Sequence, residues 1–300
     1  MFTKATRTQR KLRLAIMGLS GGGKTMTALR MATGIIGVTG GRIGMIDSES
    51  GSAAIYADRF DFDLCDLKDR TIPGYLAAIG EATKAGMQVL IIDSLSHAWA
   101  ELLEEIDQLA KRKYKGNTWS AWSEGTPKQK KLVQALLAFP GHLIVTMRVD
   151  TAWETTKDER SGKTMPVKLG LKPSQGKGIE YEFDMLMEIT REHQASVEKD
   201  RTGKYQDKVI DKPGEEFGKA LIESLLTGAP AAVADKQPAH VKELLDLFRE
   251  LGINDVAVAA TEGWVRKTYK VQGYDDLTAE QAADVATKIK AKIVKKAAAV

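Results

Sequence analysis

The most constraining feature of this chain is an octapeptide near its start. Residues Gly18 to Thr25 read Gly-Leu-Ser-Gly-Gly-Gly-Lys-Thr, a full match to the phosphate-binding loop pattern G-x-x-x-x-G-K-[ST]. An apolar, strand-like run precedes it from Leu12 to Met17, and a helix-like segment follows it. Because such a loop joins a buried strand to the N-terminus of a helix, the segment predicts an α/β fold with a nucleotide site.

The residue types of this loop suit the phosphates of a nucleotide. Glycines let successive backbone N–H groups converge on phosphate oxygens. Lys24 can reach the β- and γ-phosphates, and the Thr25 hydroxyl can hold Mg²⁺. We therefore expect ATP and Mg²⁺ as ligands, bound in this segment by Gly18, Ser20, Gly21, Gly22, Gly23, Lys24, Thr25 and Met26.

Composition and charge narrow the class of protein. No apolar run reaches the length of a membrane span, so no membrane partner is expected. The only cysteine, Cys65, excludes a disulfide framework and fits a reducing cytoplasm. The net charge of +4 is too small to imply a nucleic-acid partner by itself. The basic arm 1–10 lacks the apolar stretch of a signal peptide, and it is either a solvated segment or a nucleic-acid contact.

The order of elements predicts a mainly parallel sheet flanked by helices, in a core spanning residues 1–228. Expected strands are Leu12 to Met17, Arg42 to Ile46, Phe60 to Leu64, Gln88 to Ile92 and His142 to Met147. Expected helices are Thr25 to Ile36, Ile72 to Lys84, Leu102 to Lys111 and Pro127 to Ala138, the last starting at a Thr-Pro pair. Phe183 to Ile189 and Gln194 to Glu198 are expected to form a hairpin.

A small helical domain is expected at the C-terminal end. Residues 229–238 are rich in small residues and contain two prolines, which is typical of a linker. Three amphipathic helices are expected over 239–300, the first carrying Val241, Leu244 and Phe248 at helical spacing. This domain either recruits a partner or only stabilises the core.

Two further strands end in carboxylates. Val89 to Ile92 form an apolar run that ends in Asp93. That position suits a second Mg²⁺ ligand beside Thr25, although a buried strand ending in a polar residue would look the same. The strand before it ends in Asp47-Ser48-Glu49. A carboxylate there can activate water for attack on the γ-phosphate, unless the segment is only a solvated acidic loop. The expected catalytic residues are Lys24, Glu49 and Asp93.

These motifs, in this order, resemble the core of RecA-family recombinases. The resemblance covers roughly residues 10 to 228 and is tighter to RecA-like ATPases of phages and prophages, some of which anneal single strands. The segments Ile92 to Trp99 and Ile179 to Asp184 are typical of that group. The resemblance implies that Glu49 polarises the attacking water and that Tyr56 stacks on adenine.

The resemblance also implies roles for cations. The strand that senses the γ-phosphate in RecA ends in glutamine, whereas here it reads Ile-Val-Thr-Met-Arg, so Thr146 or Arg148 is expected to substitute. Lys199 and Arg201 resemble a pair that reaches the γ-phosphate of a neighbouring subunit, and the alternative is a solvated turn. These residues imply a homo-oligomer, either a ring or a filament.

Two basic regions are expected as loops that bind single-stranded DNA. The first runs from Lys111 to Lys131 and interleaves lysines with tryptophans, as stacking on bases requires. The second runs from Arg148 to Glu180, a length that is usually functional or disordered. In the alternative, the tryptophans are core residues and the lysines form a solvated face. The candidate DNA-binding residues are Lys113, Lys115, Trp119, Trp122, Arg160, Lys163, Lys168 and Lys172.

The resulting expectation is a cytoplasmic ATPase that binds single-stranded DNA in phage recombination, annealing or replication. Its location would be the host cytoplasm if a phage encodes it. A replication or recombination protein is a possible partner through the C-terminal helices. The rival interpretation is a nucleotide-gated loader or regulatory assembly protein that does not itself process DNA.

Overall fold

The computed structural model describes residues 7, 9–157, 164–227, 239–251, 255–271 and 273–297. Two compact units divide the chain, Met1–Pro230 and Ala231–Val300. The expected linker 229–238 and most of the expected arm 1–10 lie outside the described residues.

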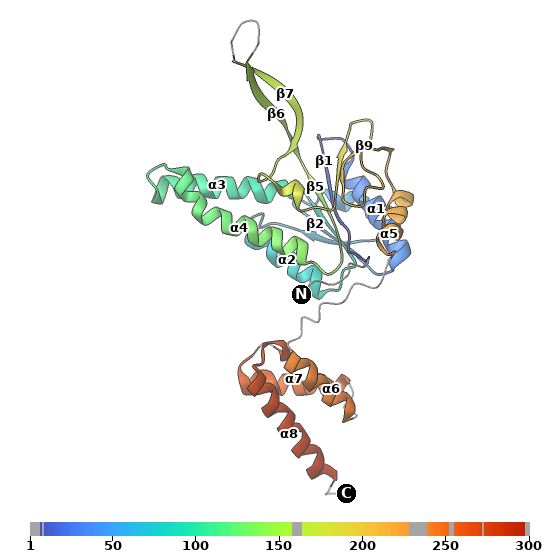
Figure 1. Ribbon diagram of the computed structural model, residues 1–300, viewed down its shortest axis with the longest axis vertical. Helices are drawn as coiled ribbons and strands as arrows, with labels where there is room; N and C mark the ends of the chain where they lie inside the picture. The colour runs from blue at the N-terminus through green and yellow to red at the C-terminus, as the bar shows by residue number, and fades with distance from the viewer. Residues whose placement is uncertain are drawn as a thin grey trace. The chain divides into compact units, whose positions relative to one another are not determined.

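The first unit is built on an eight-stranded, mainly parallel sheet (Figure 1). Its strand order is β10-β9-β8-β1-β5-β4-β2-β3, and only β9 and β10 run antiparallel to their neighbours. The strands are β1 (Arg13–Gly18), β2 (Ile43–Asp47), β3 (Asp63–Asp66), β4 (Val89–Asp93), β5 (His142–Met147), β8 (Met185–Ile189), β9 (Gln194–Asp200) and β10 (Val209–Asp211). The expected α/β core with a mainly parallel central sheet is confirmed.

Helices cover both faces of this sheet, which explains the unbroken apolar strands. One face packs on α2 (Ile72–Lys84), α3 (Ser96–Lys113) and α4 (Thr118–Ala138), and the other on α1 (Lys24–Thr39) and α5 (Glu215–Leu225). Along β1, Ala15 and Met17 join the first cluster, whereas Leu14 and Ile16 join the second. A parallel strand buried on both faces needs apolar side chains at every position.

The expected helix start at Pro127 is wrong. Helix α4 begins at Thr118, and the Asn117 side chain caps it by accepting a hydrogen bond from the Ser120 N–H at 3.1 Å. Pro127 lies inside the helix, although its ring removes one backbone hydrogen bond. Buried Ala121 and Leu132 lie on either side of this proline in the same hydrophobic cluster, so packing outweighs the local preference.

Most described residues of the two regions that were expected as loops form regular structure instead. Most of Lys111 to Lys131 belongs to the end of α3 and to α4. Much of Arg148 to Glu180 forms an antiparallel ribbon of β6 (Val149–Lys157) and β7 (Thr164–Pro173), which projects from the sheet in Figure 1. The expected hairpin of β8 and β9 is confirmed.

The second unit is a small helical domain. It contains α6 (Ala239–Glu250), α7 (Asp255–Tyr269), a short 3₁₀ turn and α8 (Ala279–Ala297) around a core that includes Val241, Phe248 and Val285. Helix α8 starts with a reciprocal cap, because Thr278 and Gln281 each accept a hydrogen bond from the other's backbone N–H. Within the described residues, every helix is too short or too polar to cross a bilayer.

His142 makes the stability of the core depend on pH. Its ring is fully buried and Nδ1 accepts the Leu12 N–H at 3.0 Å. Burial, together with nearby Lys11 and Arg13, lowers the pKa of His142 to about 3. The unfolded chain therefore takes up a proton near pH 6.5, whereas the folded chain does not. The stability that the neutral His142 ring contributes is fully present above pH 6.5 and is lost as pH falls from there toward 3.

We expect His142→Asn to flatten this dependence, because an amide oxygen can accept the Leu12 N–H without titrating. Between pH 7 and pH 5 the parent should lose about 2 kcal/mol more unfolding free energy than the variant. Denaturant titration of both proteins across this range measures the difference. Parallel pH profiles would contradict the assignment.

Candidate functional site

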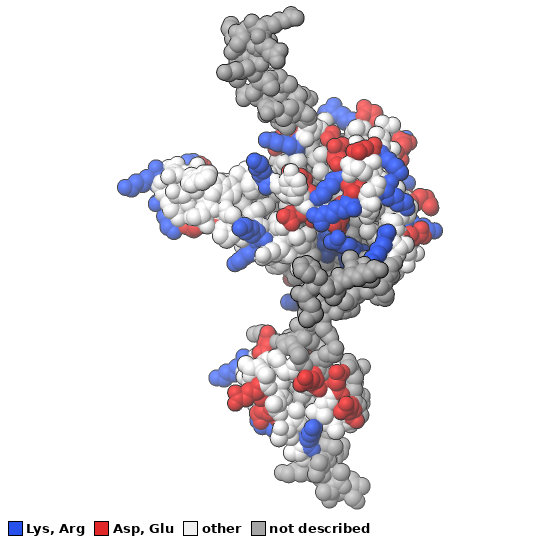
Figure 2. Space-filling view, in the orientation of Figure 1, with Lys and Arg blue, Asp and Glu red and all other residues white. Residues whose placement is uncertain are grey.

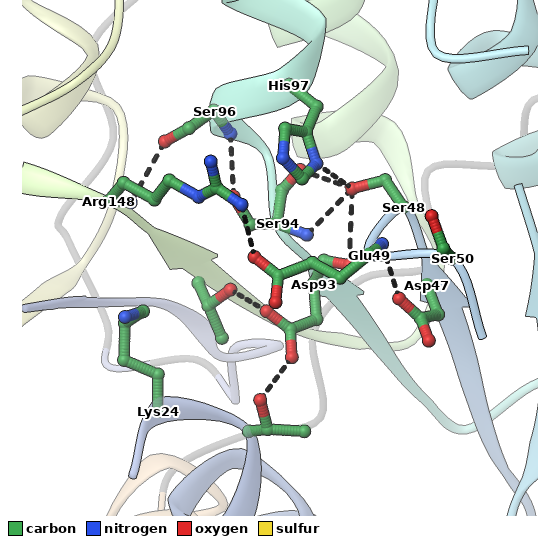
Figure 3. Close-up of polar contacts among 12 residues, drawn as sticks. Lys24, Asp47, Ser48, Glu49, Ser50, Asp93, Ser94, Ser96, His97 and Arg148 are labelled. Atoms are coloured by element: carbon green, nitrogen blue, oxygen red, sulfur yellow. Dashed lines mark hydrogen bonds and ion pairs between the residues drawn. The ribbon is translucent and has the colours of Figure 1, made fainter. Parts of the chain in front are cut away.

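The carboxyl ends of four neighbouring parallel strands bring the candidate residues together (Figure 3). The phosphate loop follows β1, Asp47 and Asp93 end β2 and β4 side by side in register, and Thr146 lies near the end of β5. In open α/β sheets, ligands bind at this edge of the strands.

The last two residues of the phosphate loop, Lys24 and Thr25, are the first two residues of α1. Gly21 and Gly23 have φ values of +80° and +84°, a region in which other residues are strained. No acidic residue lies in the first helical turn and no side chain caps it, so an anion can take its N–H groups. Lys24 lies back over the loop, and its Nζ donates to the carbonyls of Gly18 and Leu19 at 3.0 Å each. Burial lowers the pKa of Lys24, against the raising effect of Asp93 and Glu49.

Asp93 is buried and held by two hydroxyl groups. Its Oδ2 accepts a hydrogen bond from Thr25 Oγ1 at 2.5 Å, and its Oδ1 accepts one from Thr146 Oγ1. Burial raises the pKa of Asp93, while the two hydrogen bonds act in the opposite direction. Mg²⁺ prefers hard oxygen ligands and keeps several waters, so one carboxylate and one hydroxyl beside a phosphate site fit it. Among the described residues, no cluster of three His, Cys, Asp or Glu offers another metal site.

The two acidic residues at the end of β2, Asp47 and Glu49, differ in their exposure to solvent. Asp47 is fully buried, and its oxygens accept the N–H groups of Glu49 at 2.6 Å and Ala53 at 2.8 Å. Asp47 therefore shapes the turn. The Glu49 side chain is 34% exposed, and its Oε1 pairs with Arg148 Nη2 at 2.9 Å. Of the two carboxylates, only Glu49 is accessible enough to contact a water molecule.

Arg148 connects this site to the β6–β7 ribbon. It lies between β5 and β6, and its backbone N–H donates to Ser96 Oγ at 2.9 Å. Thr146, the other expected sensor, is bonded to Asp93 and lies fully buried. The Arg148 side chain is paired with Glu49 but exposed, so of the two residues it is the one that can turn toward a nucleotide.

His97 belongs to a neighbouring polar network. Its Nδ1 lies 2.7 Å from Ser48 Oγ, which also accepts the Ser94 N–H (Figure 3). Burial, and then the Arg148 charge, lower the pKa of His97. A neutral imidazole is therefore favoured at this position.

Tyr56 lies in a short 3₁₀ turn, Ser52–Tyr56, beyond Glu49. Its ring is half-buried against the cluster on the α1 face, and the Arg59 guanidinium lies 5.2 Å from the ring centre. Its adenine-stacking role stays a prediction.

Lys199 and Arg201 lie near the ends of the strands that are opposite to the phosphate loop. Asp200 pairs with Met185, which pairs with Leu14 at the start of β1, whereas Gly18 pairs with Ile189 at its end. Four residues of strand separate the two ends by about 13 Å. Both cations donate to the carbonyl of Tyr181, at 2.9 and 2.7 Å. They therefore do not contact the phosphate loop of their own chain.

The candidate DNA-binding residues are spread over helix and ribbon. Trp119 is 87% exposed near the start of α4, whereas Trp122 is partly buried and stacks on Trp99 at 5.5 Å. Lys113 pairs with Glu124 at 2.7 Å, while Lys115 and Lys172 are exposed. Arg160 and Lys163 lie outside the described residues, as does the side chain of Lys168.

Two residues that the sequence did not single out contact this site. Gln175, just after β7, is buried and donates from Nε2 to the Leu95 carbonyl at 2.6 Å, two residues after Asp93. His193 contacts the phosphate loop itself. Neither residue lies in a recognisable motif. The one sequence signal was the expected turn of the β8–β9 hairpin, which contains His193 but not Gln175.

Comparison with known proteins identifies the family. Residues 10–216 match the AAA domain family. A search of curated proteins gives no match. Among solved structures, the crystal structure of a KaiC-like protein from the hyperthermophilic archaeon Pyrococcus horikoshii OT3 matches with 17% identity and a TM-score of 0.40, over 67% of this chain and 86% of that one. With its phosphate loop and the match over most of its length, this chain belongs to the AAA domain family and carries a P-loop ATPase core.

Proposed function

We propose that this protein is a Mg²⁺-dependent ATPase that binds single-stranded DNA and assembles with itself, acting in phage recombination, annealing or replication. For hydrolysis, the observation that carries the proposal is the convergence of Lys24, Thr25, Asp93 and Glu49 at one sheet edge. The phage setting rests on the sequence resemblance alone.

Each residue has a role that its position supports. Lys24 neutralises the β- and γ-phosphates, and Thr25 and Asp93 hold Mg²⁺. Mg²⁺ held by these two residues would supply positive charge for the phosphate oxygens. Glu49 orients and deprotonates the attacking water.

The ion pair of Glu49 with Arg148 adds a control on that step. In this pair the guanidinium occupies Oε1 of Glu49, one of the two oxygens that could accept a hydrogen bond from the attacking water. A γ-phosphate competes for the same guanidinium. When Arg148 turns to the phosphate, Glu49 is released to act on water, so the base becomes active only with the triphosphate bound.

DNA binding is proposed on the outer part of the α3–α4 pair, which carries the exposed basic residues Lys111, Arg112, Lys113 and Lys115 (Figure 2). Exposed Trp119 offers a flat face for a base, and Lys115 lies three residues before the start of α4. Stacking with nearby cations suits single strands of any sequence.

A specific observation keeps the rival function open. In the same region Lys111 pairs with Asp107, Lys113 with Glu124 and Lys128 with Glu105. These pairs reduce the charge available for phosphates and favour a nucleotide-gated loader or regulator.

The first prediction concerns the base. Glu49→Gln should retain ATP binding and lower kcat by about 10²- to 10⁴-fold, because an amide cannot accept the proton. Steady-state hydrolysis and equilibrium binding of ATP separate the two effects. Exposed Glu223→Gln on α5 is the matched control and should keep the parent's rate. If Glu49→Gln hydrolyses normally while Asp93→Asn does not, the base lies elsewhere.

The second prediction concerns DNA. Trp119→Ala should weaken binding of a labelled single-stranded oligonucleotide by about 5- to 150-fold, the loss of one stacked base. Lys115→Ala should flatten the dependence of log affinity on log salt by about 0.7. Fluorescence anisotropy across a salt series measures both.

Lys113→Ala is the control for charge, because Glu124 already neutralises Lys113, and it should change the slope less than Lys115→Ala. Unchanged affinity in the Trp119 variant, together with unchanged slope in the Lys115 variant, would favour the loader or regulator.

The third prediction concerns assembly. Because Lys199 and Arg201 do not contact their own phosphate loop, a role at the γ-phosphate requires a neighbouring subunit. The double variant Lys199→Ala, Arg201→Ala should bind ATP as a monomer and fail to hydrolyse it. Mixed with Lys24→Ala, it should regain activity where its intact loop meets the other chain's cations. Light scattering and hydrolysis assays test this, and a double variant that assembles and hydrolyses alone would exclude the role.

A further inference from the structure

The turn between β8 and β9 packs directly on the phosphate loop. A Cβ atom added to Gly18 would lie 2.4 Å from the Ile189 carbonyl oxygen, and one on Gly22 would lie 3.3 Å from the carbonyl oxygens of Ile189 and Thr190. A Cβ on Gly23 would lie 3.0 Å from Nδ1 of His193. The phosphate loop can approach this turn so closely because these three positions have no side chain.

His193 is the side chain of this turn that reaches the loop. Its Nδ1 lies 3.2 Å from the carbonyl oxygen of Gly22. Since a carbonyl only accepts hydrogen bonds, Nδ1 must carry a proton and donate it. The imidazole thereby fixes the direction of the Gly22 carbonyl.

This contact also sets the direction of a donor in the loop. In a planar trans peptide, the C=O and the N–H point in opposite directions. With the Gly22 carbonyl held toward His193, the N–H of Gly23 in the same peptide unit points away from the turn. Backbone N–H groups of such loops are the donors that receive phosphate oxygens.

The backbone at His193 has a left-handed conformation that is fixed on both sides. Its φ is +64°, in the left-handed region that favours glycine and that histidine, asparagine and aspartate adopt more often than other residues do. Its N–H donates to the Thr190 carbonyl at 3.1 Å, and its carbonyl accepts the Lys212 N–H at 3.0 Å. These backbone hydrogen bonds fix the turn, so the left-handed backbone at His193 directs its imidazole toward the phosphate loop.

We propose that His193 is a positioning residue of the nucleotide site: it orients the Gly22–Gly23 peptide so that its N–H can receive a phosphate oxygen. The inference rests on the proposed binding of ATP by the phosphate loop. It adds the β8–β9 turn to that site as the support of the loop.

Three substitutions separate the side chain from the backbone. His193→Gly keeps the positive φ and removes the donor, and His193→Asn keeps both, because asparagine tolerates this region and its amide can donate. His193→Ala loses the donor and keeps the strain. With the full chain, a fluorescent ATP analogue and Mg²⁺, the Gly and Ala variants should bind about three- to tenfold more weakly, the worth of one hydrogen bond. The Asn variant should stay within about twofold of the parent.

Thermal unfolding without nucleotide provides the readout that a purely structural role would not give. His193→Gly should melt at or above the parent's temperature, because the strain is relieved, while its affinity falls. The proposal would be overturned if His193→Gly lost stability and affinity together, or if the Gly, Ala and Asn variants all bound the analogue with the same affinity. Lys24→Ala tests the underlying function separately: if it binds the analogue as tightly as the parent, the phosphate loop is not the site, whatever the His193 variants do.

Discussion

The hydrogen bonds that hold the Asp93 carboxylate are the interaction on which the site depends. Thr25 and Thr146 donate to its two oxygens, so this one side chain ties the start of α1 to the ends of β4 and β5. A buried carboxylate without such partners would be costly to ionise. The two hydroxyl groups favour its charged form inside the core, as metal binding beside the phosphate loop requires.

The ends of the β6–β7 ribbon are tied to the same place. Arg148, before β6, pairs with Glu49, and Gln175, after β7, donates to the Leu95 carbonyl just beyond Asp93. A triphosphate that draws Arg148 away from Glu49 would act on the base and on the root of the ribbon together. In our proposal this is the physical connection between the nucleotide state and a projecting surface.

The sequence predicted those features that local patterns determine. The phosphate loop, the buried strands with apolar residues at every position and the carboxylate that ends β4 each follow from a short stretch of chain. Helix α4 was misplaced because Pro127 is a strong local signal, whereas packing of Ala121 and Leu132 is not visible locally. The β6–β7 ribbon was missed although apolar residues alternate along β7, from Met165 to Leu171, because the length and the basic residues of this region were interpreted as a DNA-binding loop. Contacts such as Arg148 with Glu49 and His193 with Gly22 join residues 99 and 171 positions apart, so they required the fold.

The most direct test of the account is the effect of Mg²⁺ on ATP affinity in the parent and in Asp93→Asn. An asparagine keeps the size of the side chain and loses the charge that attracts the cation. Titration calorimetry with Mg²⁺ and with chelator gives the affinity ratio for each protein. The account predicts that Mg²⁺ strengthens binding to the parent and that this gain largely disappears in the variant. An equal gain in both would contradict the placement of the metal ion at Asp93, and with it the proposed arrangement of the site.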